Sequence, residues 1–144
     1  VDDDDKSYAI TVDFSGNVYV TGDSWGGGTY YDYVTIKYGA NGNTVWVRRY
    51  NGTGNDLDLA KAIAVDSSGN VYVFSYGSYT ISKFGPSGAL LARYGSLGTG
   101  AGQFKGHLNS AGGASPIGML AVDTSGNVYG ADSGGHRIEK FNGC

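Results

Sequence analysis

Short stretches of alternating apolar and polar residues recur along the chain, separated by turns rich in glycine, serine and asparagine. One twelve-residue pattern occurs three times, as AITVDFSGNVYV at residues 9–20, AIAVDSSGNVYV at 62–73 and MLAVDTSGNVYG at 119–130. In each copy the alternation runs up to an aspartate, a turn follows, and Val-Tyr begins a second stretch. Because a period of two is typical of β-strands, each copy predicts a β-hairpin.

The turn within each copy has the pattern Asp-x-Ser-Gly-Asn. Glycine reaches positive φ without steric cost, and Asp and Asn side chains can hydrogen-bond to turn amides. A calcium loop concentrates several carboxylates, so one aspartate per turn favours a plain turn, while Ca²⁺ stays open as the alternative. We therefore predict a structural role for nine turn residues: Asp13, Gly16, Asn17, Asp66, Gly69, Asn70, Asp123, Gly126 and Asn127.

Each hairpin is followed by a pair made of lysine and an aromatic residue, at 37–38, 83–84 and 140–141. In the first two copies a turn and one further apolar stretch come next, and that stretch ends at Arg-Tyr. Each full unit therefore predicts four antiparallel strands, which we call a to d. The motif aspartates lie 53 and 57 residues apart, and four-stranded units of about 40–50 residues are typical of β-propeller blades.

The predicted fold is all-β, a partial β-propeller of about two and three-quarter blades, because the third unit ends after strand c. The expected boundaries are 7–60 for blade 1 and its connection, 61–116 for blade 2 with a long connection, and 117–144 for the incomplete blade 3. Residues 1–6, VDDDDK, have the form of an enterokinase recognition sequence left from a tag, and they are set aside from the fold.

Two repeat families share these motifs. Residues 9–75 resemble the SBBP (seven-bladed β-propeller) repeat, typified by AIAVDSSGNVYVTG, and residues 79–141 resemble the NHL repeat through YGSLGTGAGQF and PIGMLAVDTSGNVYGADSGGHRIEKF. The resemblance implies a propeller scaffold and a bacterial parent protein that is secreted or exposed at the cell surface. The sequence departs from these repeat patterns at two places. Gly130 replaces a valine, which is expected to weaken its strand, and eleven residues separate Phe104 from Pro116 where NHL repeats have only a few.

The number of blades does not close a ring, since closed propellers have about four to eight. A solitary stack exposes two blade faces and a sheet edge. We therefore expect self-association, with a homodimer supplying about six blades around a two-fold axis. Domain swapping, or an open packing of the same hairpins, are the alternatives.

Composition and charge limit both the fold class and the kinds of binding partner that the chain is expected to have. The chain has 26 Gly and 12 Tyr but a single Glu, a composition typical of strands and turns that excludes a helical protein. Without residues 1–6 the chain has nine acidic and nine basic residues, and it shows no basic stripe, which argues against nucleic acid. No apolar run approaches the length of a membrane span. We expect a soluble chain without a nucleic-acid or membrane partner.

Antiparallel topology places the a–b and c–d turns at one end of the blades and the b–c and d–a connections at the other. The second end carries both irregular insertions, and long loops on a rigid scaffold often bind ligands. Aromatic rings beside carboxylates can stack on sugars or anchor a protein, whereas the competing interpretation is that these rings only pack at the start of strand c. The ligand-binding candidates are Trp25, Tyr30, Tyr31, Asp32 and His107.

We therefore predict a non-catalytic binding and assembly module with no catalytic residue, no metal site and no cofactor. The first alternative is a lectin-like propeller that binds carbohydrate. The second, implied by some propellers that resemble NHL repeats, is a metal-dependent lyase or hydrolase, although the chain has only two histidines that could serve as metal ligands.

His136 and Arg137 are expected to open a strand c, with Arg137 pairing to an aspartate of a neighbouring blade. The lone Cys144 cannot form an internal disulfide.

Overall fold

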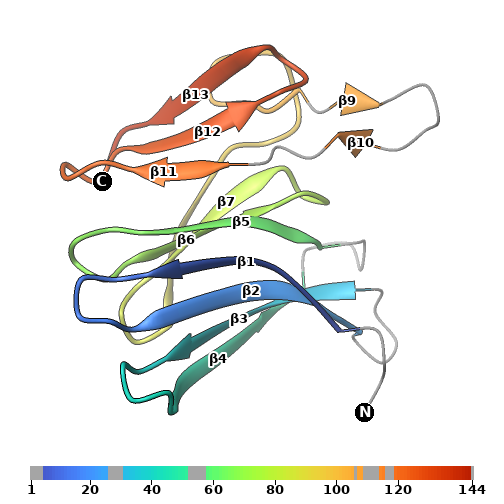
Figure 1. Ribbon diagram of the computed structural model, residues 1–144. Coiled ribbons are helices and arrows are strands. Elements are labelled where there is room, and N and C mark those ends of the chain that lie inside the picture. Colours follow the sequence, from blue (N-terminus) through green and yellow to red (C-terminus); the bar gives the residue numbers. More distant parts are fainter. Residues whose placement is uncertain are drawn as a thin grey trace.

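The computed structural model describes residues 5–25, 31–51, 58–105, 107–108, 114–115 and 119–143. These residues form β-strands and turns, and no helix among them is long and apolar enough to cross a membrane. They make two four-stranded antiparallel sheets, one three-stranded sheet and a small two-stranded hairpin (Figure 1). The prediction of an all-β partial propeller is confirmed.

Each large sheet is one blade, with strands paired in chain order as a-b-c-d. Blade 1 contains β1 (Lys6–Val12), β2 (Val18–Trp25), β3 (Tyr31–Tyr38) and β4 (Thr44–Tyr50). Blade 2 contains β5 (Ala60–Val65), β6 (Val71–Ser75), β7 (Thr80–Phe84) and β8 (Leu90–Tyr94). Blade 3 contains β11 (Leu120–Val122), β12 (Val128–Asp132) and β13 (Arg137–Phe141), the three strands expected for it.

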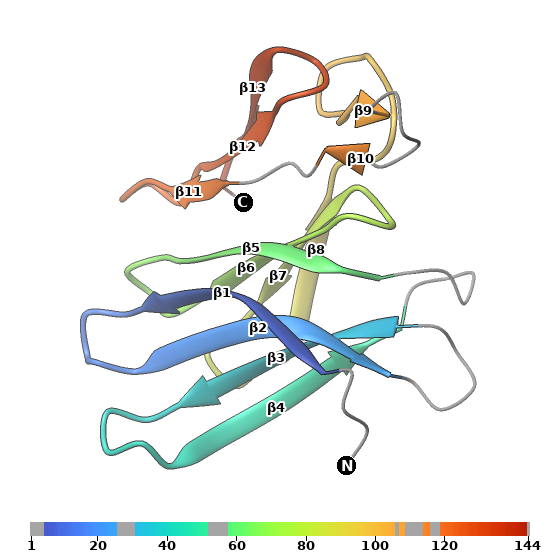
Figure 2. The same cartoon turned by 45° about the vertical axis from the view of Figure 1, so that its right-hand side comes forward.

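The three blades are stacked in chain order, with blade 2 in the middle (Figures 1 and 2). The a strands are neighbours, because β5 of blade 2 contacts both β1 and β11. The β1–β2 and β3–β4 turns lie at one end of the stack, which we call the short-turn end (Figure 1). Strands β2 and β4 end, and β3 and β5 begin, at the other end, which we call the long-loop end.

The apolar core lies between the blades. One cluster fills the space between blades 1 and 2, and it includes Tyr19, Tyr33 and Trp46 from blade 1 against Val71 and Val73 from blade 2. A second cluster fills the space between blades 2 and 3, where Tyr72 and Phe74 face Val128. Every residue of β6 is buried, because the sheets on both sides cover this strand. Stacking, and not any single sheet, therefore buries the apolar residues.

Three details go beyond the sequence expectations. Strand β1 begins at Lys6, one residue before the expected start of blade 1. The insertion in the first unit lengthens the β2–β3 hairpin, whose strands have eight residues each against five each in β6 and β7. The long connection after blade 2 contains the hairpin of β9 (His107–Leu108) and β10 (Ala114–Ser115). Tyr30, Pro116 and Cys144 lie outside the described residues.

Candidate functional site

The three Asp-x-Ser-Gly-Asn turns share one hydrogen-bond pattern. In blade 2 the Asp66 Oδ1 atom accepts from the amides of Ser68 and Asn70, both at 2.9 Å. Its Oδ2 atom accepts from Asn70 Nδ2 at 2.8 Å and from the Tyr72 hydroxyl at 3.0 Å. The same four bonds hold the turns of blades 1 and 3. Both oxygens of each carboxylate are thus engaged by protein donors.

These bonds set the charge state of the turns. Burial acts to raise the pKa of Asp66, but the hydrogen bonds from Asn70, Tyr72 and Ser68 outweigh it and the pKa is lowered. The Asn127 side chain is the largest cause that lowers the pKa of Asp123, to about 2. Burial and the Asp66 carboxylate raise the pKa of Tyr72. The tyrosine is the partner that sequence reasoning missed, although its fixed place six residues after each aspartate was visible.

Two of the predicted ligand-binding aromatics meet at the long-loop end. Trp25 ends β2, Tyr31 begins β3, and the two residues are paired across the hairpin. Their rings pack edge to face with centroids 5.3 Å apart. The Trp25 side chain is 42% exposed, whereas Tyr31 is partly buried. The pair is therefore an accessible aromatic surface built on two paired strands.

Asp32 does not join this pair. Successive residues of a strand point to opposite faces, so Asp32 lies on the other face of β3 from Tyr31, where it is buried. One of its oxygens is 3.8 Å from Arg49 Nη1. The other guanidinium nitrogen of Arg49 donates to Ser24 Oγ at 2.6 Å. Arg49, which the sequence marked only as the end of a strand, thus pairs with this carboxylate on the face of β3 opposite the aromatic rings.

The two histidines lie in different settings. The backbone of His107 pairs with Ser115 in the β9–β10 hairpin, and its ligand role stays a prediction. His136 does not open a strand: it has a φ of 52° and ends the turn before β13. Arg137, the first residue of β13, pairs with Asp132 and Glu139 of its own blade, so the expected pairing with a neighbouring blade is wrong.

Arg137 serves instead to fix the connection that leads into blade 3. Its guanidinium donates to the carbonyl oxygens of Thr99, Gly100 and Gln103 at 2.8, 3.0 and 2.8 Å. The two acidic residues that neutralise it are buried. Within the described part of the chain, no three His, Cys, Asp or Glu side chains gather in a way that could hold a metal ion.

The face of blade 1 that points away from blade 2, which we call the free face of blade 1, is apolar. Its residues alternate with those of the buried cluster and include Ile10, Val12, Val18, Val20, Val34, Ile36 and Val47. No described sheet packs on it. Ile10 is 70% exposed, whereas Ile63 at the equivalent place in blade 2 is 8% exposed, because blade 1 covers it.

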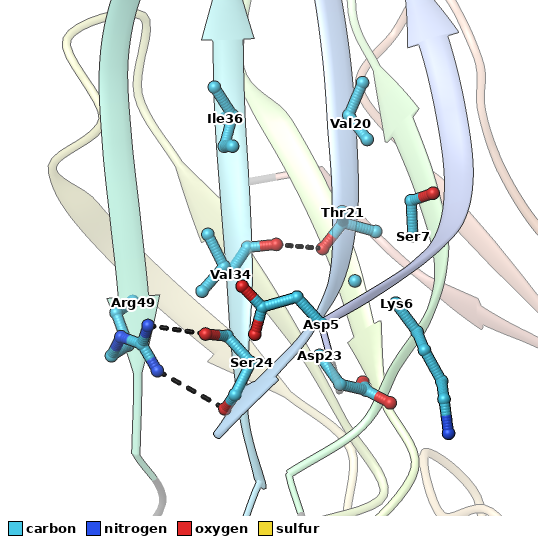
Figure 3. Close-up of a pocket in the computed structure, with 11 residues that line it drawn as sticks. Asp5, Lys6, Ser7, Val20, Thr21, Asp23, Ser24, Val34, Ile36 and Arg49 are labelled. Carbon is cyan, nitrogen blue, oxygen red and sulfur yellow. Dashed lines mark hydrogen bonds between the residues drawn. The ribbon is translucent and has the colours of Figure 1, made fainter. Parts of the chain in front are cut away.

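A cavity of about 340 Å³ opens on this face (Figure 3). Val20, Val34 and Ile36 give it an apolar wall, while Arg49 and Ser24 lie at its polar end. Near this end Asp23 is buried beneath Tyr8, Lys61 and the Ala60 amide. Burial raises the pKa of Asp23, although these three partners act to lower it.

The opposite end of the stack presents the free face of blade 3, which points away from blade 2. It carries Met119, Ala121, Tyr129, Ala131, Ile138 and Lys140, as the β11–β12 and β12–β13 registers place them. Ile138 is 69% exposed, whereas the equivalent Ile81 of blade 2 is fully buried against blade 3. Both ends of the stack thus present surfaces that the repeat buries wherever a neighbouring blade is present.

Comparison with known proteins supports the fold. The model of the SBBP beta-propeller repeat family matches residues 2–28, a stretch that contains β1, the first turn and β2. Its start lies within the six residues that we read as a cleavage sequence. No curated protein matches the chain. The resemblance of residues 79–141 to NHL repeats stays a prediction.

Among the solved structures that resemble this chain, one is matched over the whole of it. It is described as a protein of unknown function from Bacteroides caccae, with 12% sequence identity and a TM-score of 0.54. The match covers 100% of this chain but 48% of that one, so the chain spans about half the length of this solved relative. At this identity the likeness shows the fold alone. The chain is similar to one beta-propeller repeat in sequence and to about half of a larger protein in fold.

Proposed function

We propose that this chain is a non-catalytic assembly module that forms a homodimer and so completes a propeller ring. The observation that carries the proposal is the contrast between Ile10 and Ile63, equivalent residues of which one is exposed and one is buried between blades. Burying apolar surface is worth roughly 25 cal/mol per Å². A second copy offers the surface that the repeat already uses to cover such a face.

The number of blades supports two copies. Three stacked sheets in each chain give about six blades in a dimer, within the range of closed propellers. A two-fold arrangement is the commonest symmetry of homo-oligomers. The fold match points the same way, because this chain corresponds to about half of a longer solved chain. By its resemblance to SBBP repeats, we place the parent protein outside a bacterial cell.

The test compares two aspartate substitutions by multi-angle light scattering. Ile10→Asp puts a charge on the free face of blade 1, and we expect it to reduce the two-chain mass to that of one chain. Phe14→Asp is the matched control, because Phe14 is fully exposed in the β1–β2 turn and lies outside both free faces. A two-chain mass that survives Ile10→Asp contradicts the proposal, provided that circular dichroism shows both variants folded.

A second function is favoured by the Trp25–Tyr31 pair at the long-loop end. We propose that this exposed aromatic surface binds a ligand, with a carbohydrate as the first candidate, since sugar rings stack on aromatic faces. A glycan array with the wild type and Trp25→Ala tests it. Binding that Trp25→Ala abolishes supports the site, while an array with no bound glycan rejects the carbohydrate and leaves a protein ligand.

A further inference from the structure

The two free faces are not alike, and their difference fixes how two copies can join. Resting on the proposed self-association, we infer that the copies pack head to tail, with the free face of blade 3 in one copy against the free face of blade 1 in the other. A two-fold axis then makes this junction twice. Each junction continues the stacking order that already exists within the chain.

Both interfaces inside the chain have the same polarity. Blade 1 presents Tyr19 to blade 2, and blade 2 presents Tyr72 to blade 3. The receiving face of blade 2 carries Ile63, Val71 and Val73, which pack against Tyr19, Tyr33 and Trp46. An earlier blade therefore always offers its tyrosine face, and the later blade receives it with an aliphatic face.

The free face of blade 3 has the features of an offering face. Tyr129 occupies the place of Tyr19 and Tyr72, and its hydroxyl is held by Asp123 at 3.0 Å. The Lys140 ammonium lies 5.6 Å from the Tyr129 ring centre. The corresponding distances are 5.2 Å in blade 1 and 5.5 Å in blade 2, where the faces are covered. The tyrosine and lysine of blade 3 are thus already arranged as they are at an internal junction.

The free face of blade 1 has the features of a receiving face. Ile10, Val18 and Val20 occupy the places of Ile63, Val71 and Val73. Those three residues of blade 2 are buried by blade 1, whereas no described sheet covers their counterparts in blade 1. An aliphatic receiving face matches the tyrosine face of blade 3 better than it matches a second copy of itself.

The cavity on blade 1 marks the place where the internal junction holds an aromatic ring. In the junction of blades 1 and 2, the Tyr33 hydroxyl donates to Ser82 Oγ at 3.0 Å. The counterpart of Ser82 in blade 1 is Ile36, which lines the cavity. The cavity thus corresponds to the site that Tyr33 of blade 1 fills at the junction of blades 1 and 2.

Blade 3 can supply that ring. Tyr33 lies two residues before Thr35, and Tyr79 lies two residues before the equivalent Ile81; both tyrosines pack toward the next blade. The residue at this place in blade 3 is His136, two before Ile138, and its side chain is exposed. By this equivalence of position, we place His136 of the second copy at the cavity beside Ile36.

The experiment uses two variants that each block one face, Ile10→Asp and Ile138→Asp. Leu91→Asp, on the outer strand β8, is the matched control for the second, because Leu91 is also exposed but lies on neither free face. If junctions run head to tail, each blocked variant alone loses its two-chain species, with a dissociation constant raised by about tenfold or more. Val12→Asp and Ala121→Asp repeat the test should either first variant fail to fold.

Mixing the two variants gives the sharper result. An equimolar mixture with one partner labelled with ¹⁵N is expected to show a mixed dimer by native mass spectrometry, since one unblocked junction remains between unlike copies. Loss of association in only one of the two variants, or the absence of a mixed dimer, overturns the head-to-tail arrangement while leaving self-association intact. A wild type with the mass of one chain at every concentration overturns the self-association itself.

Discussion

The ring of Phe104 lies directly against the backbone of Gly130. A Cβ atom at residue 130 would come within 2.9 Å of Phe104 Cε1, closer than such atoms pack in proteins. Phe104 belongs to the connection between blades 2 and 3, is fully buried, and contacts the rings of Phe74 and Phe141. The glycine that interrupts the third repeat therefore makes room for an aromatic anchor of the long connection.

This close contact predicts that replacing Gly130 with the valine of the other two repeats destabilises the fold. Gly130→Val gives blade 3 the residue that the other two copies have at this position, and valine normally favours a strand. We expect it to lower the free energy of unfolding by about 1–3 kcal/mol, because the new side chain has no space beside Phe104. Urea denaturation measures the change.

The double variant Gly130→Val with Phe104→Ala provides the control. Removing the ring makes room for the valine, so the two costs are expected to be strongly non-additive. Additive costs, or a Gly130→Val variant more stable than the wild type, contradict the steric account.

The junction of blades 1 and 2 contains a buried hydrogen bond that can be measured by a double-mutant cycle. Tyr33 and Ser82 are both fully buried, and their side chains bond to each other. Either Tyr33→Phe or Ser82→Ala is expected to cost about 1–3 kcal/mol, because the remaining hydroxyl loses its partner inside the core. The double variant should cost less than the sum of the two. A coupling energy of zero between them rejects a direct bond.

Acid is expected to weaken the turns. The pKa values of Asp13, Asp66 and Asp123 are lowered in the folded chain, that of Asp123 to about 2. A carboxylate with a lowered folded pKa contributes stability that is present above its unfolded value, about 3.9, and is lost as pH falls through the folded value. The free energy of unfolding should therefore decrease from about pH 5 toward about pH 2.

Asp66→Asn isolates one of these carboxylates. The amide places an NH₂ group opposite the donors Asn70 Nδ2 and Tyr72 OH, so the variant should be less stable at neutral pH. It should also show a shallower loss of stability in acid, since one titrating group is gone. An acid dependence as steep as that of the wild type refutes the assignment.

Calcium is expected to leave the fold unchanged. Both oxygens of each turn aspartate already accept hydrogen bonds from the chain, and a cation would have to displace those donors. The melting temperature should therefore be the same in millimolar Ca²⁺ and in a chelator. A melting temperature that rises with Ca²⁺ concentration points to binding at a site other than the turns as described, and contradicts this prediction.

The local parts of the fold could be predicted because they rest on local chemistry. The Asp-x-Ser-Gly-Asn turn and the alternation on either side of it define each a–b hairpin within some twelve residues, and counting the strands predicted the three strands of the third blade. The alternation also determines which residues share the free faces, once blade 2 shows which face is covered.

The remaining features depend on contacts between distant segments. The ion pair of Asp32 with Arg49 crosses from β3 to β4, and Arg137 reaches carbonyl groups more than thirty residues earlier. Nothing in the neighbourhood of Gly130 indicates that Phe104 lies above it. Because tertiary packing determines these partners, the structure departs from the sequence prediction more at the candidate site than in the fold. Trp25 and Tyr31 lie together, while Asp32 lies on the opposite face of β3.

The most direct test of the central claim is the absolute mass of the wild-type chain in solution, measured by light scattering over a dilution series. Reducing agent must be present, so that Cys144 cannot link two copies through a disulfide. Two copies that complete a ring predict a mass of twice that of one chain, and this mass should persist until dilution dissociates both junctions together. A mass of one chain at every concentration contradicts the account, because the exposed faces of blades 1 and 3 would then remain uncovered.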